Sequence, residues 1–402
     1  MQQTRLTLDQ DRLNVSDKSR SNIFNWRGQF TPQFIDYLLS SFSKPGHIVI
    51  DPFSGSGTVL YECARRGLDC YGFEINPAAY AMSKFFTLSG KSPEDRKKLI
   101  SALKSKVFSI LDPYQDMPLF RESRKYRKQY SNLTDFSQNL FSVTDDKVQN
   151  LLAVNMLFIA ESKKNETLYS AITNSYEYIT NMLLKLPFTE RSIYACLCDS
   201  RATYKMIRNN GDLVITSPPY INVFNYHQNY RAILETLGWD ILKVAKSEIG
   251  SNRKNRGNRF RTVVQYSLEI ELSLRSLWHS LKNGAFLVFV VGRESKVRGI
   301  PFYNGMIIKD IMQEMGSFED ITTHERQFTN RFGNTIKEDI IVAKKGERDC
   351  NPVARSISLN HLKRAAEQAK DDVKKDMEQV IHQIDKIECS PIFNEKGVLK
   401  NV

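Results

Sequence analysis

The chain has 402 residues, of which 41% are hydrophobic and 25% charged, and this composition excludes a disordered chain. Six cysteines at irregular spacing argue against a disulfide framework, and no apolar run is long enough to cross a bilayer. A polar N-terminus without a secretory signal then predicts a cytoplasmic protein with no membrane partner. Lysine and arginine exceed aspartate and glutamate by 57 to 45, a net charge of +12 that favours nucleic acid as partner over a merely basic, solvated surface.

The first predicted elements follow a polar arm over residues 1–28. Apolar residues at helical spacing predict a helix over about 34–42, which the Pro-Gly pair at 45–46 ends. The next segment predicts a strand, a glycine loop, a helix and a second strand, which together form the βαβ unit of a parallel sheet. These elements are expected at 47–50, 51–57, 58–66 and 70–73.

A long helical stretch separates this unit from the next predicted strand, at 192–197. Its length, from about 77 to 185, exceeds what a crossover connection needs. We therefore expect an inserted helical subdomain over 91–189, which is a candidate DNA-recognition region. The sheet then resumes with strands predicted at 212–216, 285–291, 321–326 and 339–343.

The last third of the chain contains two strongly charged segments. Residues 246–261 carry six basic residues and one acid among glycines and asparagines, which predicts a flexible loop. In the tail, apolar residues recur in steps of three and four and predict one long amphipathic helix over about 357–388.

The glycine loop, DPFSGSGT at 51–58, lies where the first strand meets its helix. Its glycines permit a sharp turn and a close approach of a ligand to the backbone. The Gly-Lys-Ser/Thr ending of ATPase phosphate loops and the full dinucleotide fingerprint are both absent. Because Asp51 opens the loop and would repel phosphate, the loop suits a ligand with a positive or amino group.

Two further acids, Glu74 and Asp199, close the second and third predicted strands. The carboxyl ends of strands at a switch point are where open α/β sheets bind ligands. Glu74 is then placed to accept hydrogen bonds from ribose hydroxyls, and Asp199 to reach an adenine amino group. The alternative is that these acids only cap helices.

The fourth predicted strand runs into Ser217-Pro218-Pro219-Tyr220. Two prolines cannot continue a central strand, so they form a rigid corner with its carbonyls held outward. Ser217 and the Pro218 carbonyl can accept hydrogen bonds from an exocyclic amine, and Tyr220 can stack on a flat heterocycle. This arrangement turns the nitrogen lone pair out of the ring plane and toward an electrophile.

These two motifs, at 51–58 and 217–220, resemble those of the S-adenosylmethionine-dependent DNA amino-methyltransferases. The serine form of the second motif is typical of the N4-cytosine enzymes, whereas N6-adenine enzymes usually carry Asp or Asn. Residues 26–34 resemble the family's extra cofactor motif. The resemblance covers about 22–90, 190–240 and, more weakly, 284–345.

The resemblance implies an α/β fold of the Rossmann-like class I methyltransferase type: a mostly parallel seven-stranded sheet with helices on both faces, plus the helical insertion and a C-terminal helix. The methyltransferase catalytic domain would comprise 29–90 and 190–346, with the tail at 347–402. The implied catalytic residues are Ser217, Pro218, Pro219 and Tyr220. The implied S-adenosylmethionine-binding residues are Phe30, Thr31, Asp51, Pro52, Phe53, Gly55, Gly57, Thr58, Glu74, Asn76, Asp199 and Ser200.

The implied reaction is transfer of a methyl group from S-adenosylmethionine to the N4 amine of a cytosine flipped out of double-stranded DNA. The expected setting is restriction-modification or a related defence system, with a cognate restriction enzyme or defence proteins as partners. Alternatives are an N6-adenine DNA enzyme, an RNA base methyltransferase, and a nucleic-acid-binding module with a degenerate cofactor site. Metal is not expected, because the six histidines show no ligand spacing.

Basic residues on the loop after the corner are the first candidates for phosphate contacts: Arg253, Lys254, Arg256, Arg259 and Arg261. A second basic cluster, interleaved with aromatic residues, lies at 120–130, and the turn at 331–333 is a weaker candidate. Tyr226, His227 and Tyr230 follow the corner and are expected either to wall the base pocket or to pack in the core. Solvated surface is the alternative for both basic clusters.

Overall fold

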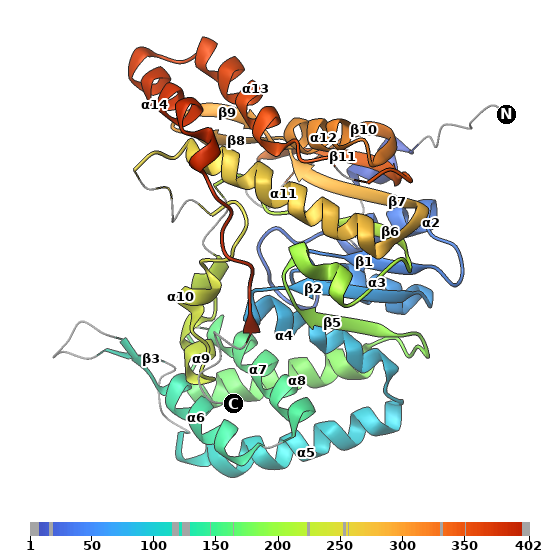
Figure 1. Cartoon of the computed structure of the whole chain (residues 1–402). Helices are drawn as coiled ribbons and strands as arrows, with labels where there is room; N and C mark the ends of the chain where they lie inside the picture. Colours follow the sequence, from blue (N-terminus) through green and yellow to red (C-terminus); the bar gives the residue numbers. More distant parts are fainter. Residues whose placement is uncertain are drawn as a thin grey trace.

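The computed structural model describes residues 8–15, 19–114, 120–122, 129–144, 146–163, 165–222, 226–251, 255, 257–329, 333–349 and 351–395 (Figure 1). Within them a seven-stranded sheet has the order β10-β11-β7-β6-β1-β2-β5. Its strands are β1 (Ile48–Asp51), β2 (Asp69–Glu74), β5 (Ile193–Leu197), β6 (Gly211–Thr216), β7 (Leu281–Gly292), β10 (Phe318–Thr329) and β11 (Thr335–Lys345).

Five neighbouring strands, β5, β2, β1, β6 and β7, run parallel, and β11 pairs antiparallel with both β7 and β10. The chain builds outward from β1 to β5 and then crosses back to place β6 on the other side of β1. This reversal creates a switch point between β1 and β6, where ligands bind in open α/β sheets. The mostly parallel seven-stranded sheet expected from the resemblance is confirmed.

Successive residues of the central strands enter two different cores, because side chains alternate between the faces of a sheet. Val49 of β1 belongs to one buried cluster, which contains α2 (Pro32–Phe42), α3 (Thr58–Arg66) and α4 (Pro77–Phe85). Ile50 belongs to the other, with α11 (Arg261–Ser280) and α12 (Asn304–Met315). Helices therefore cover both faces.

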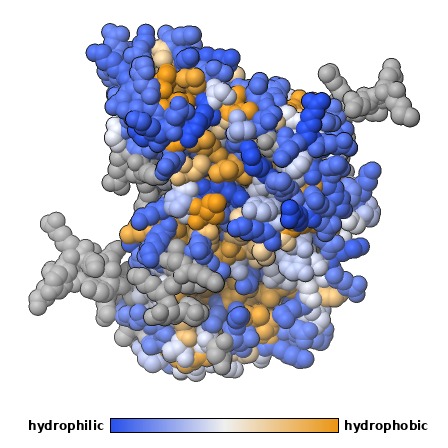
Figure 2. Space-filling view, viewed as in Figure 1, coloured by the Kyte–Doolittle hydropathy of each residue, from blue (hydrophilic) through white to orange (hydrophobic). Residues whose placement is uncertain are grey.

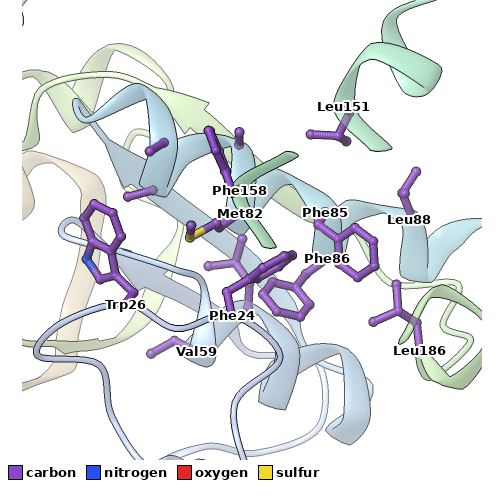
Figure 3. Packing of buried hydrophobic residues seen from close by; sticks show 14 of the residues in the cluster. Phe24, Trp26, Val59, Met82, Phe85, Phe86, Leu88, Leu151, Phe158 and Leu186 are labelled. Carbon is purple, nitrogen blue, oxygen red and sulfur yellow. The ribbon is translucent and has the colours of Figure 1, made fainter. Parts of the chain in front are cut away.

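The expected helical insertion is present, with α5 (Pro93–Leu111), α6 (Asn132–Val143), α7 (Lys147–Glu161) and α8 (Leu168–Lys185). Its buried side chains belong to the same cluster as those of α2 to α4, so the insertion extends one core of the sheet domain. Figure 3 shows this continuity, with Phe158 of α7 beside Met82 of α4. Asn155 of α7 also donates to the carbonyl of Ala81 at 2.9 Å.

A buried arginine clamps the two junctions of the insertion. The guanidinium of Arg96 donates to the carbonyls of Leu88 and Ser89 on one side and of Leu186 and Pro187 on the other, at 2.5–3.2 Å. Since each contact satisfies a buried polar group, this clamp holds the ends of a long excursion together.

The tail differs from the single long helix that its periodicity predicts. It forms two helices, α13 (Ala354–Glu367) and α14 (Asp371–His382), which pack against each other. Met377 and Val380 of α14 are buried in the same cluster as Leu362 of α13, a contact that a straight helix could not make. Two acids in the first turn of α14 favour the new helix start. Burial of one apolar stripe against the other is the reason for the break.

The remaining elements are short. They are α1 (Gln10–Asn14), α9 (Arg231–Thr236), α10 (Ile241–Val244), the strand pairs β3 (Phe120–Glu122) with β4 (Gln129–Ser131) and β8 (Glu294–Val297) with β9 (Ile300–Tyr303), and the 3-10 turns η1 (Phe86–Gly90), η2 (Asp112–Tyr114), η3 (Ser200–Lys205), η4 (Tyr226–Gln228) and η6 (Ile384–Lys386). Hydrophobic residues gather along the middle of the face in Figure 2, with mostly hydrophilic surface over the tail helices. Among the described residues, no helix is both long and apolar enough to span a membrane.

Candidate active site

A cavity opens at the carboxyl ends of the central strands, and both sequence motifs line it. Residues 51–56 border one side, and Ser217 to Tyr220 border the other. The predicted residues that line the cavity are Phe30, Asp51, Pro52, Phe53, Gly55, Thr58, Glu74, Asn76, Asp199, Ser200, Ser217, Pro218, Pro219 and Tyr220. The pairing of β1 with β6 therefore brings the two motifs to one site. Asp51 and Thr216, which are 165 residues apart in the sequence, are hydrogen-bonded there.

Two predicted cofactor residues, Thr31 and Gly57, do not border the cavity. Thr31 instead precedes α2 as its N-cap residue. Gly57 precedes α3 with φ +90°, and a Cβ there would lie 2.7 Å from the ring of Phe86 and 2.8 Å from the Cα of Ser83. Gly57 is thus required for the turn and for close packing of α3 against the following segment, and it shapes the loop from behind.

Asp51 is buried at the end of β1 and lines the cavity. Its Oδ1 accepts hydrogen bonds from the hydroxyl of Thr216 at 2.6 Å and from the N–H of Phe53 at 3.1 Å. Burial raises the pKa of Asp51 to about 7, although these two hydrogen bonds oppose the rise. A carboxylate so poorly compensated gains from a cationic ligand.

Glu74 at the end of β2 receives three backbone N–H groups. Oε1 accepts from Ile75 at 2.9 Å and Asn76 at 2.8 Å, and Oε2 accepts from Gly55 at 3.0 Å. Burial nevertheless raises the pKa of Glu74 to about 7, and the charge of Asp51 adds to the rise. Oε2 retains acceptor capacity, since a carboxylate oxygen can accept two hydrogen bonds. Glu74 also ties the glycine loop to β2.

Asp199 also lines the cavity, but both of its carboxylate oxygens are already engaged in hydrogen bonds within the protein. Oδ1 accepts from the backbone N and the Nε of Arg201, and Oδ2 accepts from Nη2 of Arg201 and the N–H of Phe393. These four hydrogen bonds use the whole acceptor capacity of the carboxylate. Asp199 is also the N-cap of η3, which is the helix-capping alternative that its position allowed.

Glycines on two neighbouring segments allow the chain to pack closely against the proline corner. A Cβ at Gly292 of β7 would lie 2.8 Å from the ring of Tyr220, and a Cβ at Gly250 would lie 2.4 Å from its carbonyl oxygen. The hydroxyl groups of Ser217 and Tyr220 lie 3.4 Å apart. Burial raises the pKa of Tyr220 far above its usual value, so the phenol stays neutral. The corner therefore has a fixed shape and no charge of its own.

The N-terminal arm closes one side of the cavity, which its polar composition did not indicate. Trp26 stacks on Tyr226 with ring centroids 5.6 Å apart and an angle of 16° between the ring planes. Figure 3 shows Phe24 of the arm against Phe85 and Phe86, with centroid distances of 5.4 and 6.1 Å. The sequence signal for this part of the chain was the resemblance of residues 26–34 to the family's extra cofactor motif.

Tyr226, which was expected either to wall the pocket or to pack in the core, lines the cavity. Further residues line the cavity beyond those expected. They are Trp26, Arg27, Gly28, Gln29, Ser54, Ser56, Val59, Phe73, Ile75, Cys198, Ser247, Glu248 and Ile249. The stretch 247–250 was expected to be flexible loop, but it is buried against Tyr220 and Tyr266. Of the other residues after the corner, Tyr230 packs on Phe158, with ring centroids 4.5 Å apart.

The predicted phosphate-binding residues are described only in part. Arg253, Lys254 and Arg256 lie outside the described residues, as do most of the 120–130 cluster and the Arg-Phe pair at 331–332. Arg259 is exposed, and Arg261 donates to Gln383 in the tail at 3.0 Å. Arg261 is thus engaged within the chain, while Arg259 stays accessible. Metal ligands were not expected, and the described part of the chain holds no group of three His, Cys, Asp or Glu placed for one.

The cavity suits S-adenosylmethionine by its chemistry. Aromatic side chains, Trp26, Phe30 and Phe53, supply apolar walls, while Asp51 and Glu74 supply buried carboxylates with raised pKa values. A ligand with an ammonium group, a sulfonium and ribose hydroxyls would relieve both carboxylates.

Comparison with known proteins points to the same chemistry. Residues 7–85 match the N6/N4 methyltransferase family model, described as DNA methylase. The type II methyltransferase M.MjaII of Methanocaldococcus jannaschii is 26% identical over 173 residues, 41% of this chain and 32% of that protein. M.AvaI of Nostoc sp. is 21% identical over 381 residues, 73% of this chain and 78% of that protein. M.MvaI of Kocuria varians is 35% identical over 101 residues, 25% of this chain and 20% of that protein.

The alignment thus spans about a third of the length of M.MjaII and more than three quarters of M.AvaI. The family model covers the arm, the glycine loop and the end of β2, which together form the cofactor side of the cavity. With the Ser-Pro-Pro-Tyr corner on the facing side, the chain is similar to the S-adenosylmethionine-dependent DNA amino-methyltransferases on both sides of the cavity.

Proposed function

We propose that this protein methylates the exocyclic N4 amine of a cytosine flipped out of double-stranded DNA. The observation that carries this proposal is the shared cavity, in which the acidic glycine loop at 51–58 faces the corner at 217–220. The serine at the first position of the corner supports cytosine as the base, by resemblance to N4 enzymes.

Each side of the cavity has its own task in this proposal. Asp51 binds the ammonium group of the cofactor and Glu74 binds its ribose. Ser217 and the Pro218 carbonyl accept the amine hydrogens, while Tyr220 stacks on the flipped base. When bound, S-adenosylmethionine supplies a methyl group on a positively charged sulfur. The residues therefore contribute position and dipoles, and no covalent nucleophile is needed.

The proposed reaction also implies the partners of the protein. Double-stranded DNA is the substrate, and the net charge of +12 supports its binding. The type II names of the relatives support a restriction-modification setting in the cytoplasm, with a cognate restriction enzyme or another defence protein acting on the same site. The insertion at 91–189 and the loop that carries Arg259 are the candidate DNA-contacting regions.

The direct test identifies the methylated nucleoside. The protein is incubated with labelled S-adenosylmethionine and a mixture of bacterial DNA and RNA, and the digested nucleosides are separated by mass spectrometry. The expected product is N4-methylcytosine from DNA. N6-methyladenine or a methylated RNA base would replace the proposed substrate with that one.

A matched variant tests the corner. Ser217→Ala is expected to lower the rate of methyl transfer about 100-fold, since one aligned polar group is lost from the reacting centre. Its affinity for S-adenosylhomocysteine, measured by calorimetry, is expected to stay unchanged. Equal activity of the two proteins would remove the role given to the corner.

A further inference from the structure

A buried pair, Glu248 and His227, lies in the wall of the cavity and has no part in the scheme above. Glu248 is 8% exposed and His227 1% exposed. Oε2 of Glu248 lies 3.3 Å from Nδ1 of His227, within reach of a hydrogen bond. Glu248 lines the same cavity as both motifs.

The second carboxylate oxygen of Glu248, Oε1, is not used by the contact with His227. Oε1 is shielded from solvent and has no hydrogen-bond partner among the residues that the structure describes. Leaving a buried acceptor unsatisfied costs free energy, so such an oxygen in the wall of a ligand cavity calls for a donor from the ligand. His227 holds the carboxylate from one side and leaves this oxygen for that donor.

Two neighbours place Glu248 near the corner. Two residues further on, Gly250 has φ +75°, and its missing side chain leaves room for the carbonyl oxygen of Tyr220. Burial raises the pKa of Tyr226, which also lines the cavity, to about 12, and the charges of Glu74 and Glu248 add to the rise. Glu248 therefore lies in the part of the cavity wall that is close to the proline corner and to Tyr226.

The proposed reaction needs a group of this kind. An exocyclic amine that gains a methyl group must lose a proton to end as a neutral product. The corner offers a hydroxyl and backbone carbonyls, which hold N–H groups but are too weakly basic to keep a proton near neutral pH. A positioned carboxylate can both stabilise the positive charge that develops on nitrogen and accept the proton.

We propose, on the basis of the methyltransferase function above, that Glu248 is the proton acceptor of the reaction and that His227 positions it. Glu248 Oε1 takes the proton that the amine nitrogen gives up as the nitrogen lone pair forms the bond to the methyl carbon. The methyl–sulfur bond breaks with its electron pair left on sulfur. The carboxylate ends as a neutral carboxylic acid and the sulfur as a neutral thioether, so atoms and charge balance. The carboxylic acid then passes its proton to solvent when the product leaves.

The experiment measures single-turnover methyl transfer at saturating cofactor for the wild type, Glu248→Gln and Glu248→Asp. Gln keeps the volume and the contact to His227 but cannot accept a proton. We expect its rate to fall about 100-fold, while Asp recovers part of the rate. Calorimetric affinity for S-adenosylhomocysteine is expected to stay within about twofold in both, since the pair acts on the amine.

Glu235→Gln is the matched control, because this exposed glutamate of α9 pairs with Arg231 at 2.7 Å and does not line the cavity. It should leave the rate unchanged. The proposal is overturned if Glu248→Gln keeps its rate within threefold, if Glu248→Asp recovers none of the lost rate, or if lost cofactor affinity accounts for the whole defect. Absence of methyl transfer to any nucleic acid by the wild type would instead overturn the proposed function.

Discussion

The carboxylates at the ends of β1 and β2 differ from the carboxylate at the end of β5, although all three follow parallel strands in one sheet. Asp51 and Glu74 are held by neutral donors, a hydroxyl and backbone N–H groups, and their pKa values are raised to about 7. Asp199 has Arg201 as a buried partner, with Arg201 Nη2 at 2.6 Å. The same position in the fold thus yields two carboxylates held by neutral donors and one carboxylate held in an ion pair.

The partner of each acid explains the difference. Arg201 also donates to the carbonyls of Ser390 and Pro391, and the N–H of Phe393 completes Asp199. Asp199 therefore fastens the segment after the tail helices to the rim of the cavity. A position at the end of a strand brings a carboxylate to the cavity. Its partners then decide whether the carboxylate keeps acceptor capacity for a ligand or is fully used in contacts within the protein.

Removing the partner of Asp199 should have the largest effect. Arg201→Met leaves a buried carboxylate without its cation, and we expect the free energy of unfolding to fall by about 3–5 kcal/mol. Urea unfolding of the variant and of Arg201→Met with Asp199→Asn measures it, and the double variant should recover part of the loss. A loss below about 1 kcal/mol would mean that the ion pair has little structural role.

The opposite outcome is expected for Asp51→Asn. Its ionised carboxylate is costly to bury, so its removal should leave the free energy of unfolding at pH 8 unchanged or raise it. Affinity for S-adenosylmethionine should fall about tenfold or more, because a charge-assisted hydrogen bond to the ammonium is lost. Calorimetry and urea unfolding on one preparation give both values. Unchanged affinity would contradict the assignment of Asp51 to the cofactor.

The raised pKa values also predict a pH dependence. Asp51 and Glu74 keep their protons in the folded protein up to about pH 7, so the stability that this contributes is present at pH 4 and is lost as pH rises through 7. Cofactor affinity should change in the other direction, rising about tenfold per carboxylate between pH 6 and 8. Melting temperatures with and without S-adenosylhomocysteine test this, and the Asp51→Asn variant should show the smaller rise.

The smallest effect concerns the exposed basic loop. Arg259→Gln should lower the slope of DNA affinity against salt concentration by about one and leave cofactor affinity unchanged. Arg261→Gln is the comparison, since Arg261 already donates to Gln383 and should contribute less. Equal slopes for wild type and Arg259→Gln would show that this side chain does not contact phosphate.

Local rules predicted most of the sheet and the residues of both motifs. Alternating or continuous apolar runs marked the strands within a few residues, and glycine and proline marked the loop and the corner. The break between α13 and α14 escaped prediction because it depends on burial of Met377 against another helix and not on the helix period. Glu248 escaped for a related reason: nothing in a basic, glycine-containing segment indicates that its one acid is buried.

The chain order and spacing of residues by themselves determined a βαβ unit with an acidic glycine loop, a proline corner after a later strand, and hence the chemistry of the two motifs. Tertiary structure decided which acids face the cavity, that the N-terminal arm closes it, and that His227 meets Glu248. The reason is that strand and turn signals are local in the sequence. The partner of a buried charge, in contrast, comes from elsewhere in the chain, as Phe393 does for Asp199, and only packing brings the two together.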